Sequence, residues 1–255
     1  YFFISTSMME AKEELKEETL LSHLIELRSR LLKMGASILV VFLVLAPFSD
    51  FIFRSIALPL MEQLPEGSTM IATQVASPFL TPFKTTMFAA LFLSMPVVLY
   101  QVWGFTAPGL YKKEKRFAVP LLLSSIVLFY CGTVFAYLVV FPLMFAFFTS
   151  AAPTGVAVMT DIASYLDFVL VLFFAFGIAF EVPIATVVLV WSGLTSVETL
   201  AKNRAYVFLG AFVVGMLITP PDVISQTLLA VPVYLLYECG ILLSKILTNK
   251  KEEVD

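Results

Sequence analysis

Charged residues are scarce in this chain, since only 14% of its 255 residues are Asp, Glu, Lys or Arg. A soluble domain usually contains about 25% of such residues. Hydrophobic residues instead make up 60% of the chain, and the mean hydropathy is +0.94. Because the excess falls in long uncharged runs, the composition excludes an ordinary soluble domain and indicates an integral membrane protein.

Cysteine and histidine are nearly absent. Cys131 and Cys239 lie in separate apolar runs, so we expect small packing residues and neither a disulfide framework nor a zinc site. The single histidine, His23, lies outside every apolar run, and no G-x-S-x-G motif occurs. An intramembrane serine protease is therefore disfavoured, and the lack of an intramembrane aspartate pair disfavours the aspartyl type. We expect no enzymatic activity, no cofactor and no metal.

Six apolar runs predict an all-α polytopic protein with six transmembrane helices. The fifth run has fourteen residues, about 21 Å at about 1.5 Å per residue, against a hydrocarbon core of about 30 Å. The unbroken apolar part of the sixth is only Leu228–Tyr237, so we expect the last two helices to be short. The runs cover about Met34–Phe53, Thr85–Val102, Phe117–Phe148, Leu166–Trp191, Tyr206–Thr219, and from Asp222 to about Leu247.

The segment before the first run is charged and amphipathic. Glu10–Lys33 predicts a helix that lies at the membrane surface and runs into the first span. Glu26 and Arg30 are four residues apart, in the orientation that favours pairing. We divide the chain into a charged tail (1–20), one six-helix membrane domain (21–247) and a second tail (248–255). Tyr1–Ser7 precede two methionines and are interpreted as upstream sequence.

Basic residues predict the orientation of the spans. Fourteen of the sixteen Lys and Arg residues fall before the first run, after the second, after the fourth or in the tail. Only Arg54 and Lys84 fall on the other side. Because cytoplasmic segments carry the excess of basic residues, both termini are predicted to be cytoplasmic.

Glu181 is the side chain of the apolar runs whose insertion into the bilayer should cost the most free energy. A charged side chain in the bilayer costs about 2.5–3.5 kcal/mol on insertion scales, so Glu181 should face protein or water. Pro183 should kink the fourth helix just before it, and Pro142 should end or kink the third. We interpret Glu181 as a polar point in a cavity; a protonated or hydrogen-bonded packing residue is the alternative.

Two carboxylates on the predicted cytoplasmic side are candidates for ligand binding. Glu26 stands in the first charged segment, and Glu114 stands in the loop Leu110–Arg116. Each could simply pair with neighbouring bases. Together they predict a site for a doubly cationic ligand, because carboxylates accept guanidinium groups bidentately and discriminate Arg from Lys by geometry.

Polar residues bracket the tight turn Pro220–Asp222 between the last two runs. Met216, Thr219 and Gln226 could simply satisfy the helix ends there. They could instead form a docking face for another transmembrane helix, where side-chain hydrogen bonds hold helices together.

Five short motifs, each weak alone, occur in a specific order and spacing relative to the six spans. They are His23-Leu-x-Glu-Leu-Arg28, Tyr100-Gln-x-Trp-x-Phe105, Ala107-Pro-x-Leu-Tyr111, Phe176-Gly-x-x-Phe-Glu-x-Pro183 and Thr219-Pro-Pro-Asp222. In these motifs, and from about residue 21 to residue 247, the chain resembles the TatC family, the multispanning component of the twin-arginine protein translocase.

The resemblance implies a receptor for the signal peptides of folded cargo that carry consecutive arginines. It would work in the bacterial cytoplasmic membrane and use the proton-motive force, which agrees with the absence of a G-x-x-x-x-G-K-[ST] loop. By matching positions, Glu26 and Glu114 would receive the arginines. The residues that would shape the same site are Arg28, Phe105, Tyr111 and Lys112.

The resemblance also implies partners and further functional positions. Single-span TatA and TatB subunits would dock around Met216, Thr219 and Gln226, and other copies of the chain would join the complex. No nucleic acid is expected. Glu181 would lie in the concave membrane face of the family. Pro59 and Asp222 match functionally important positions in the first outside loop and in the hairpin turn.

A proton-coupled secondary transporter of a small solute is the alternative function. It would use Glu181 as a proton carrier beside a broken helix. Such a transporter predicts paired halves with matching interruptions, and the sequence shows no convincing internal repeat. This alternative also leaves the cytoplasmic motifs unexplained.

Overall fold

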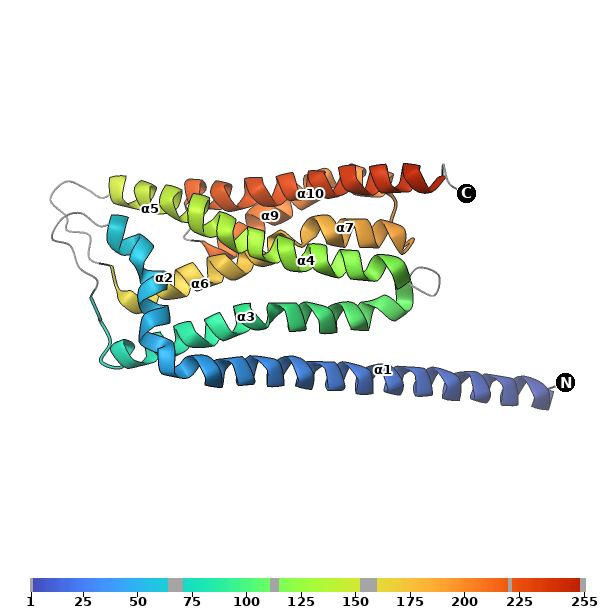
Figure 1. Ribbon diagram of the computed structural model, residues 1–255. Helices are drawn as coiled ribbons and strands as arrows, with labels where there is room; N and C mark the ends of the chain where they lie inside the picture. The colour runs from blue at the N-terminus through green and yellow to red at the C-terminus, as the bar shows by residue number, and fades with distance from the viewer. Residues whose placement is uncertain (1, 64–70, 111–114, 152–159, 220–221, 253–255) are drawn as a thin grey trace.

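The computed structural model describes residues 2–63, 71–110, 115–151, 160–219 and 222–252, and these residues are almost entirely helical (Figure 1). The described part contains one isolated β-bridge, between Ile71 and Asp161. The predicted all-α class is confirmed. The helices are α1 (Phe2–Leu45), α2 (Ser49–Gln63), α3 (Ser77–Leu110), α4 (Lys115–Phe135), α5 (Phe141–Ser150), α6 (Ile162–Ala179), α7 (Val182–Trp191), α8 (Val197–Lys202), α9 (Arg204–Ile218) and α10 (Val223–Glu252).

Five stretches of the described residues are long and apolar enough to cross a membrane, and α9 is a sixth, shorter apolar helix. This confirms the polytopic prediction and the short fifth span. The two ends of the chain lie at the same end of the bundle (Figure 1). The long stretches are Leu21–Ala57, Ser77–Phe105, Val119–Phe148, Ile162–Trp191 and Val223–Leu247.

The prediction of a short last helix is wrong. The helix α10 has 30 residues, and its apolar stretch has 25. Glu238 interrupts the apolar run in the sequence, but its Oε1 pairs with Nε of Arg204 on α9 at 2.7 Å. Glutamate favours the helical backbone, and the cationic partner offsets the cost of a charge within the apolar stretch, so α10 continues through Glu238.

The prediction that the first charged segment is a helix that runs into the first span is confirmed, and its position at the membrane surface stays a prediction. Residues 2–45 form one unbroken helix, which continues the axis of the first span and extends beyond the bundle (Figure 1). No proline interrupts it before Pro47, where a 3-10 turn (Ala46–Phe48) separates α1 from α2. The segment Glu10–Lys33 is therefore continuous with the helix of the first span.

Prolines break two of the spans, as the sequence predicts. A π-helical turn (Ala136–Val140) separates α4 from α5 directly before Pro142. Phe180 and Glu181 separate α6 from α7 directly before Pro183. The cause is the same in both places, because proline lacks the N–H that would continue the helical hydrogen bonds.

Aromatic packing between α4, α5 and α6 forms the centre of the molecule. The rings of Phe141 and Phe173 lie 4.8 Å apart, and Phe176 is fully buried. The backbones approach closely here, since a Cβ atom at Gly132 would lie 2.4 Å from the carbonyl oxygen of Phe176. The helix α7 packs mainly on α10 instead.

Asp161 joins two loops at the end of the bundle opposite the termini. Asp161 caps α6, because its Oδ2 accepts hydrogen bonds from the backbone N–H and the hydroxyl of Ser164. Its Oδ1 accepts two hydrogen bonds from Thr73. These bonds, led by that from the Ser164 backbone, hold the pKa of the Asp161 carboxyl well below its usual range.

Candidate functional site

Glu26 and Arg30 meet where α1 packs on α3. Nε and Nη2 of Arg30 donate to Oε1 of Glu26 at 3.0 and 2.7 Å, which confirms the pair that the sequence predicts. The same guanidinium donates from Nη1 to the carbonyl oxygen of Gln101 at 3.3 Å and from Nη2 to that of Gly104 at 2.8 Å. Glu26 is thus held by an arginine that is itself bound to the backbone of α3.

Gly104 allows the arginine to approach α3 this closely. A Cβ atom at this position would lie 2.3 Å from Nη1 of Arg30. Beside Gly104, the ring of Phe105 lies 6.1 Å from that of His23, centroid to centroid. The structure therefore brings the first two sequence motifs together at one point.

A cleft of about 550 Å³ opens beside this contact. Its walls are polar and charged as well as apolar, which suits a peptide that carries both charged and apolar groups. Arg28 is exposed on α1 outside the lining of this cleft. The lining residues are Ser22, Ile25, Glu26, Ser29, Arg30, Lys33, Tyr100 and Gln101.

The other predicted residues of this site are not all placed. Tyr111, Lys112 and Glu114 lie outside the described residues, between the end of α3 and the start of α4. Pro59 belongs to α2, and its side chain also lies outside the described part of the structure.

Glu181 lies at the break between α6 and α7 and is half-buried. Its Oε1 atom is buried and has no hydrogen-bond partner among the described residues. The hydroxyl of Ser125 on α4 interacts with the same carboxyl group and accepts a hydrogen bond from Nε1 of Trp103 at 3.0 Å. A line of polar groups therefore connects α3 to Glu181. Ser125 was not singled out from the sequence, although the pair Ser124 and Ser125 within the third apolar run could have indicated a polar contact there.

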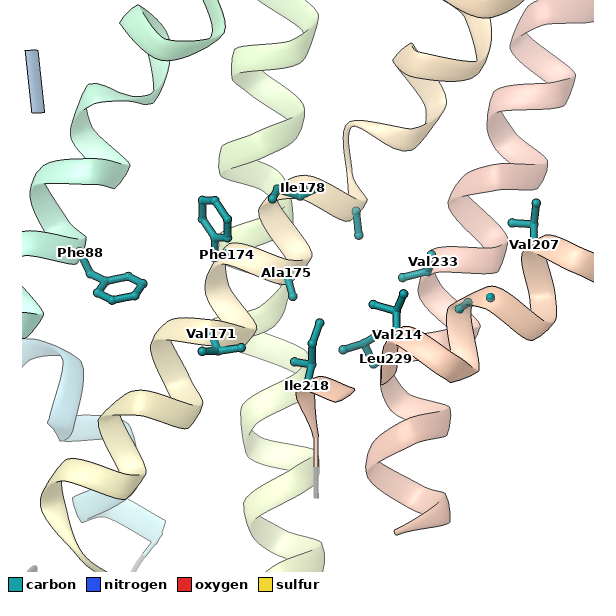
Figure 2. Close-up of a pocket in the computed structure, with 13 residues that line it drawn as sticks. Phe88, Val171, Phe174, Ala175, Ile178, Val207, Val214, Ile218, Leu229 and Val233 are labelled. Atoms are coloured by element: carbon teal, nitrogen blue, oxygen red, sulfur yellow. The ribbon is translucent and has the colours of Figure 1, made fainter. Parts of the chain in front are cut away.

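An apolar groove of about 600 Å³ lies between α3, α6, α9 and α10 (Figure 2). Ile178 and Ala179 at the end of α6 form part of its wall, so Glu181 follows the groove lining by two residues. On the opposite wall, Val214 and Ile218 of α9 face α6 (Figure 2).

The hairpin between α9 and α10 holds the third group of candidate residues. The hydroxyl of Thr219, a buried residue, donates to the carbonyl oxygen of Gly215 at 2.9 Å. Oδ1 of Asp222 accepts a hydrogen bond from the backbone of Ser225 at 2.7 Å and caps α10. Met216 is 53% exposed, and Gln226 is half-buried. Thr219 and Asp222 thus satisfy helix ends, while Met216 faces outward.

Comparison with known proteins decides the family. A family model described as "Sec-independent protein translocase protein (TatC)" matches residues 22–232. The chain belongs to the TatC family. Its sequence is 59% identical over 233 residues to the TatC of Escherichia coli strain K12, which covers 91% of this chain and 90% of that protein. It is also 59% identical over 233 residues to the TatC of Azotobacter chroococcum mcd 1, with 91% of each covered.

Solved TatC structures have the same fold. The crystal structure of a protein described as "Twin Arginine Translocase Receptor- TatC" superposes with a TM-score of 0.80 at 39% identity, over 89% of this chain and 99% of that one. This TatC chain is a multi-pass component of the Sec-independent protein translocase, and the alternative of a small-solute transporter is set aside.

Proposed function

We propose that this TatC chain is the signal-peptide receptor of its translocase. The observation that carries the proposal is the Glu26 carboxylate, which lies in the wall of the 550 Å³ cleft and already binds one guanidinium group. Both bonds from Arg30 end on Oε1. Because a carboxylate offers about four acceptor positions, the group has room for a second guanidinium.

In this proposal the two arginines of the peptide bind Glu26 and Glu114. Arginine is preferred over lysine because its planar fork matches a carboxylate with two parallel hydrogen bonds. Arg30 keeps Glu26 pointing along the contact between α1 and α3, so that the carboxylate is preorganised. Arg28, Phe105, Tyr111 and Lys112 shape the remainder of the site.

The later steps involve the membrane-spanning part. The apolar segment of the peptide inserts along the helices, and single-span TatA and TatB subunits dock around Met216, Thr219 and Gln226. The short α9 recruits them by thinning the bilayer locally. Glu181, Pro59 and Asp222 act in transport rather than in first recognition, and the proton-motive force drives it. Other copies of the chain complete the complex.

The chain is oriented in the bacterial cytoplasmic membrane with both termini in the cytoplasm. Two features support this part of the proposal. The two ends of the chain lie at one end of the bundle (Figure 1), and fourteen of the sixteen basic residues belong to the segments that the sequence predicts to be cytoplasmic. The cleft at Glu26 then faces the compartment in which cargo folds.

The test is binding of a twin-arginine signal peptide to the purified chain in lipid nanodiscs. A peptide with both arginines changed to lysine should bind about tenfold more weakly, and Glu26→Ala and Glu114→Ala should each remove that difference. Glu198→Ala is the matched control, because Glu198 is an exposed carboxylate on α8 outside the cleft. Equal binding of the two peptides to the unaltered chain would contradict the proposal.

A further inference from the structure

An exposed ion pair lies near one end of the apolar groove. Nζ of Lys84 on α3 binds Oδ1 of Asp167 on α6, and each side chain is 51% exposed. Lys84 lies four residues before Phe88, and Asp167 lies four residues before Val171; Phe88 and Val171 both line the groove (Figure 2). Residues four apart share one face of a helix. The ion pair therefore lies one helical turn beyond the groove lining, on the same face.

The lengths of the two spans place the ion pair close to the boundary between the hydrocarbon core and the lipid headgroups. The apolar stretch that contains Lys84 has 29 residues, so it is about 44 Å long and exceeds a hydrocarbon core of about 30 Å by about 7 Å at each end. At about 1.5 Å per residue, Lys84 lies about 10 Å from the start of α3, and Asp167 lies about 8 Å from the start of α6. Both charges fall near the boundary between hydrocarbon and headgroups.

The groove and the ion pair present different chemistry to the bilayer. Every residue that lines the groove is apolar, and the volume of about 600 Å³ is in the usual range for a ligand pocket. Lys84 and Asp167 neutralise each other, but half of each side chain is exposed and can bind a further group of opposite charge. A lysine and an aspartate side by side match a ligand that carries an anionic and a cationic group next to each other.

We propose that the groove binds a phospholipid with a zwitterionic ethanolamine headgroup. One acyl chain fills the groove, the phosphate binds Lys84, and the ammonium group binds Asp167. A transmembrane helix from a partner subunit would also cover the apolar lining, but an apolar helix offers no charged groups to the exposed sides of Lys84 and Asp167. The lipid site is separate from the cleft at Glu26 and does not depend on the receptor proposal.

Native mass spectrometry of the purified full-length chain tests this site. The delipidated protein is incubated with equal amounts of phosphatidylethanolamine and phosphatidylglycerol, and the retained lipid is identified. We expect about a tenfold preference for phosphatidylethanolamine, which corresponds to one charge-assisted hydrogen bond. The double variant Lys84→Gln/Asp167→Asn keeps the net charge and should lose the preference. Asp167→Asn alone should reverse it, because it leaves an unpaired lysine.

Two further variants separate the headgroup site from the groove. The double variant Arg204→Gln/Glu238→Gln removes an ion pair between α9 and α10 without changing the net charge, and it should keep the preference. Ala175→Trp fills the groove and should lose the retained lipid whatever its headgroup; Val214→Trp does the same from α9 if the first variant fails to fold (Figure 2). The proposal is overturned if the unaltered chain retains neither lipid, if the Lys84 double variant keeps the preference, or if both filled grooves still retain lipid.

Discussion

The first and fourth spans of this chain differ in how much of their surface is buried against other helices. Half of the residues in the apolar window of Ile162–Trp191 are buried within the structure, against 6% in that of Leu21–Ala57. The helix α6 packs mainly on α4 and also contacts α3, α9 and α10, whereas α1 packs mainly on α3. The fourth span is part of the core, and the first span lies along its edge.

This difference indicates where the molecule can adjust. Close-packed aromatic side chains fix α6, while α1 is fixed to α3 by a ring contact of 5.0 Å between Phe42 and Phe83 and by the hydrogen bonds of Arg30. The proposed receptor carboxylate, Glu26, is therefore carried by a helix that packs mainly on one neighbour. Polar contacts at one point can be rearranged by a ligand more easily than a packed core can.

The largest contrast is expected from truncating one side chain in each span. Phe176→Ala in α6 should lower the free energy of unfolding by about 3 kcal/mol, because it leaves a cavity in a fully buried site. Leu39→Ala in α1, where the side chain is 56% exposed, should change it by less than about 0.5 kcal/mol. Denaturant unfolding in one detergent measures both, and equal losses would contradict the comparison.

Glycine-to-alanine substitutions should have opposite effects on stability in the packed part of the molecule and in α1. A Cβ atom at Gly240 of α10 would lie 2.1 Å from the hydroxyl oxygen of Thr186 and 3.0 Å from Cα of Pro183, so Gly240→Ala should cost about 1–3 kcal/mol. A Cβ atom at Gly35 of α1 meets nothing within 4 Å, so Gly35→Ala should stabilise the helix by up to about 1 kcal/mol. Melting temperatures should therefore move in opposite directions.

Removing Arg30 should release α1 while leaving the core intact. Arg30→Ala removes the bonds to Glu26, Gln101 and Gly104 and should cost about 1–2 kcal/mol locally. Amide hydrogen exchange should quicken in α1 around residue 30 and stay unchanged in α6. Ser29→Ala, at the exposed neighbouring position, is the control. Faster exchange in α6 would show that the two spans unfold together.

The smallest effect concerns pH at the start of the core span. The pKa of Asp161 is lowered by its hydrogen bonds to Ser164 and Thr73, so its contribution to stability is present above the unfolded value of about 3.9 and is lost as pH falls below it. Melting temperatures measured between pH 7 and pH 3 should fall more in the unaltered chain than in Asp161→Asn. Parallel curves would contradict the prediction.

Local features of the structure could be predicted from the sequence, and distant pairings could not. The apolar runs and prolines predict the spans and their breaks, and four-residue spacing predicts the pair Glu26–Arg30. The same arginine reaches Gln101 and Gly104, 71 and 74 positions away, and no local pattern shows this. The length of α10 was missed for the same reason, since Glu238 finds its partner Arg204 34 positions away.

The break at Phe180 and Glu181 divides the membrane region mechanically. Before it, α6 packs mainly on α4; after it, α7 packs mainly on α10. The backbone at this break therefore joins two helices with different main neighbours, although α6 also contacts α9 and α10. The apolar groove is walled by α3 and α6 from one part and by α9 and α10 from the other. A change in the angle between α6 and α7 would therefore change the width of the groove, which couples the shape of the lipid-facing surface to the position of Glu181.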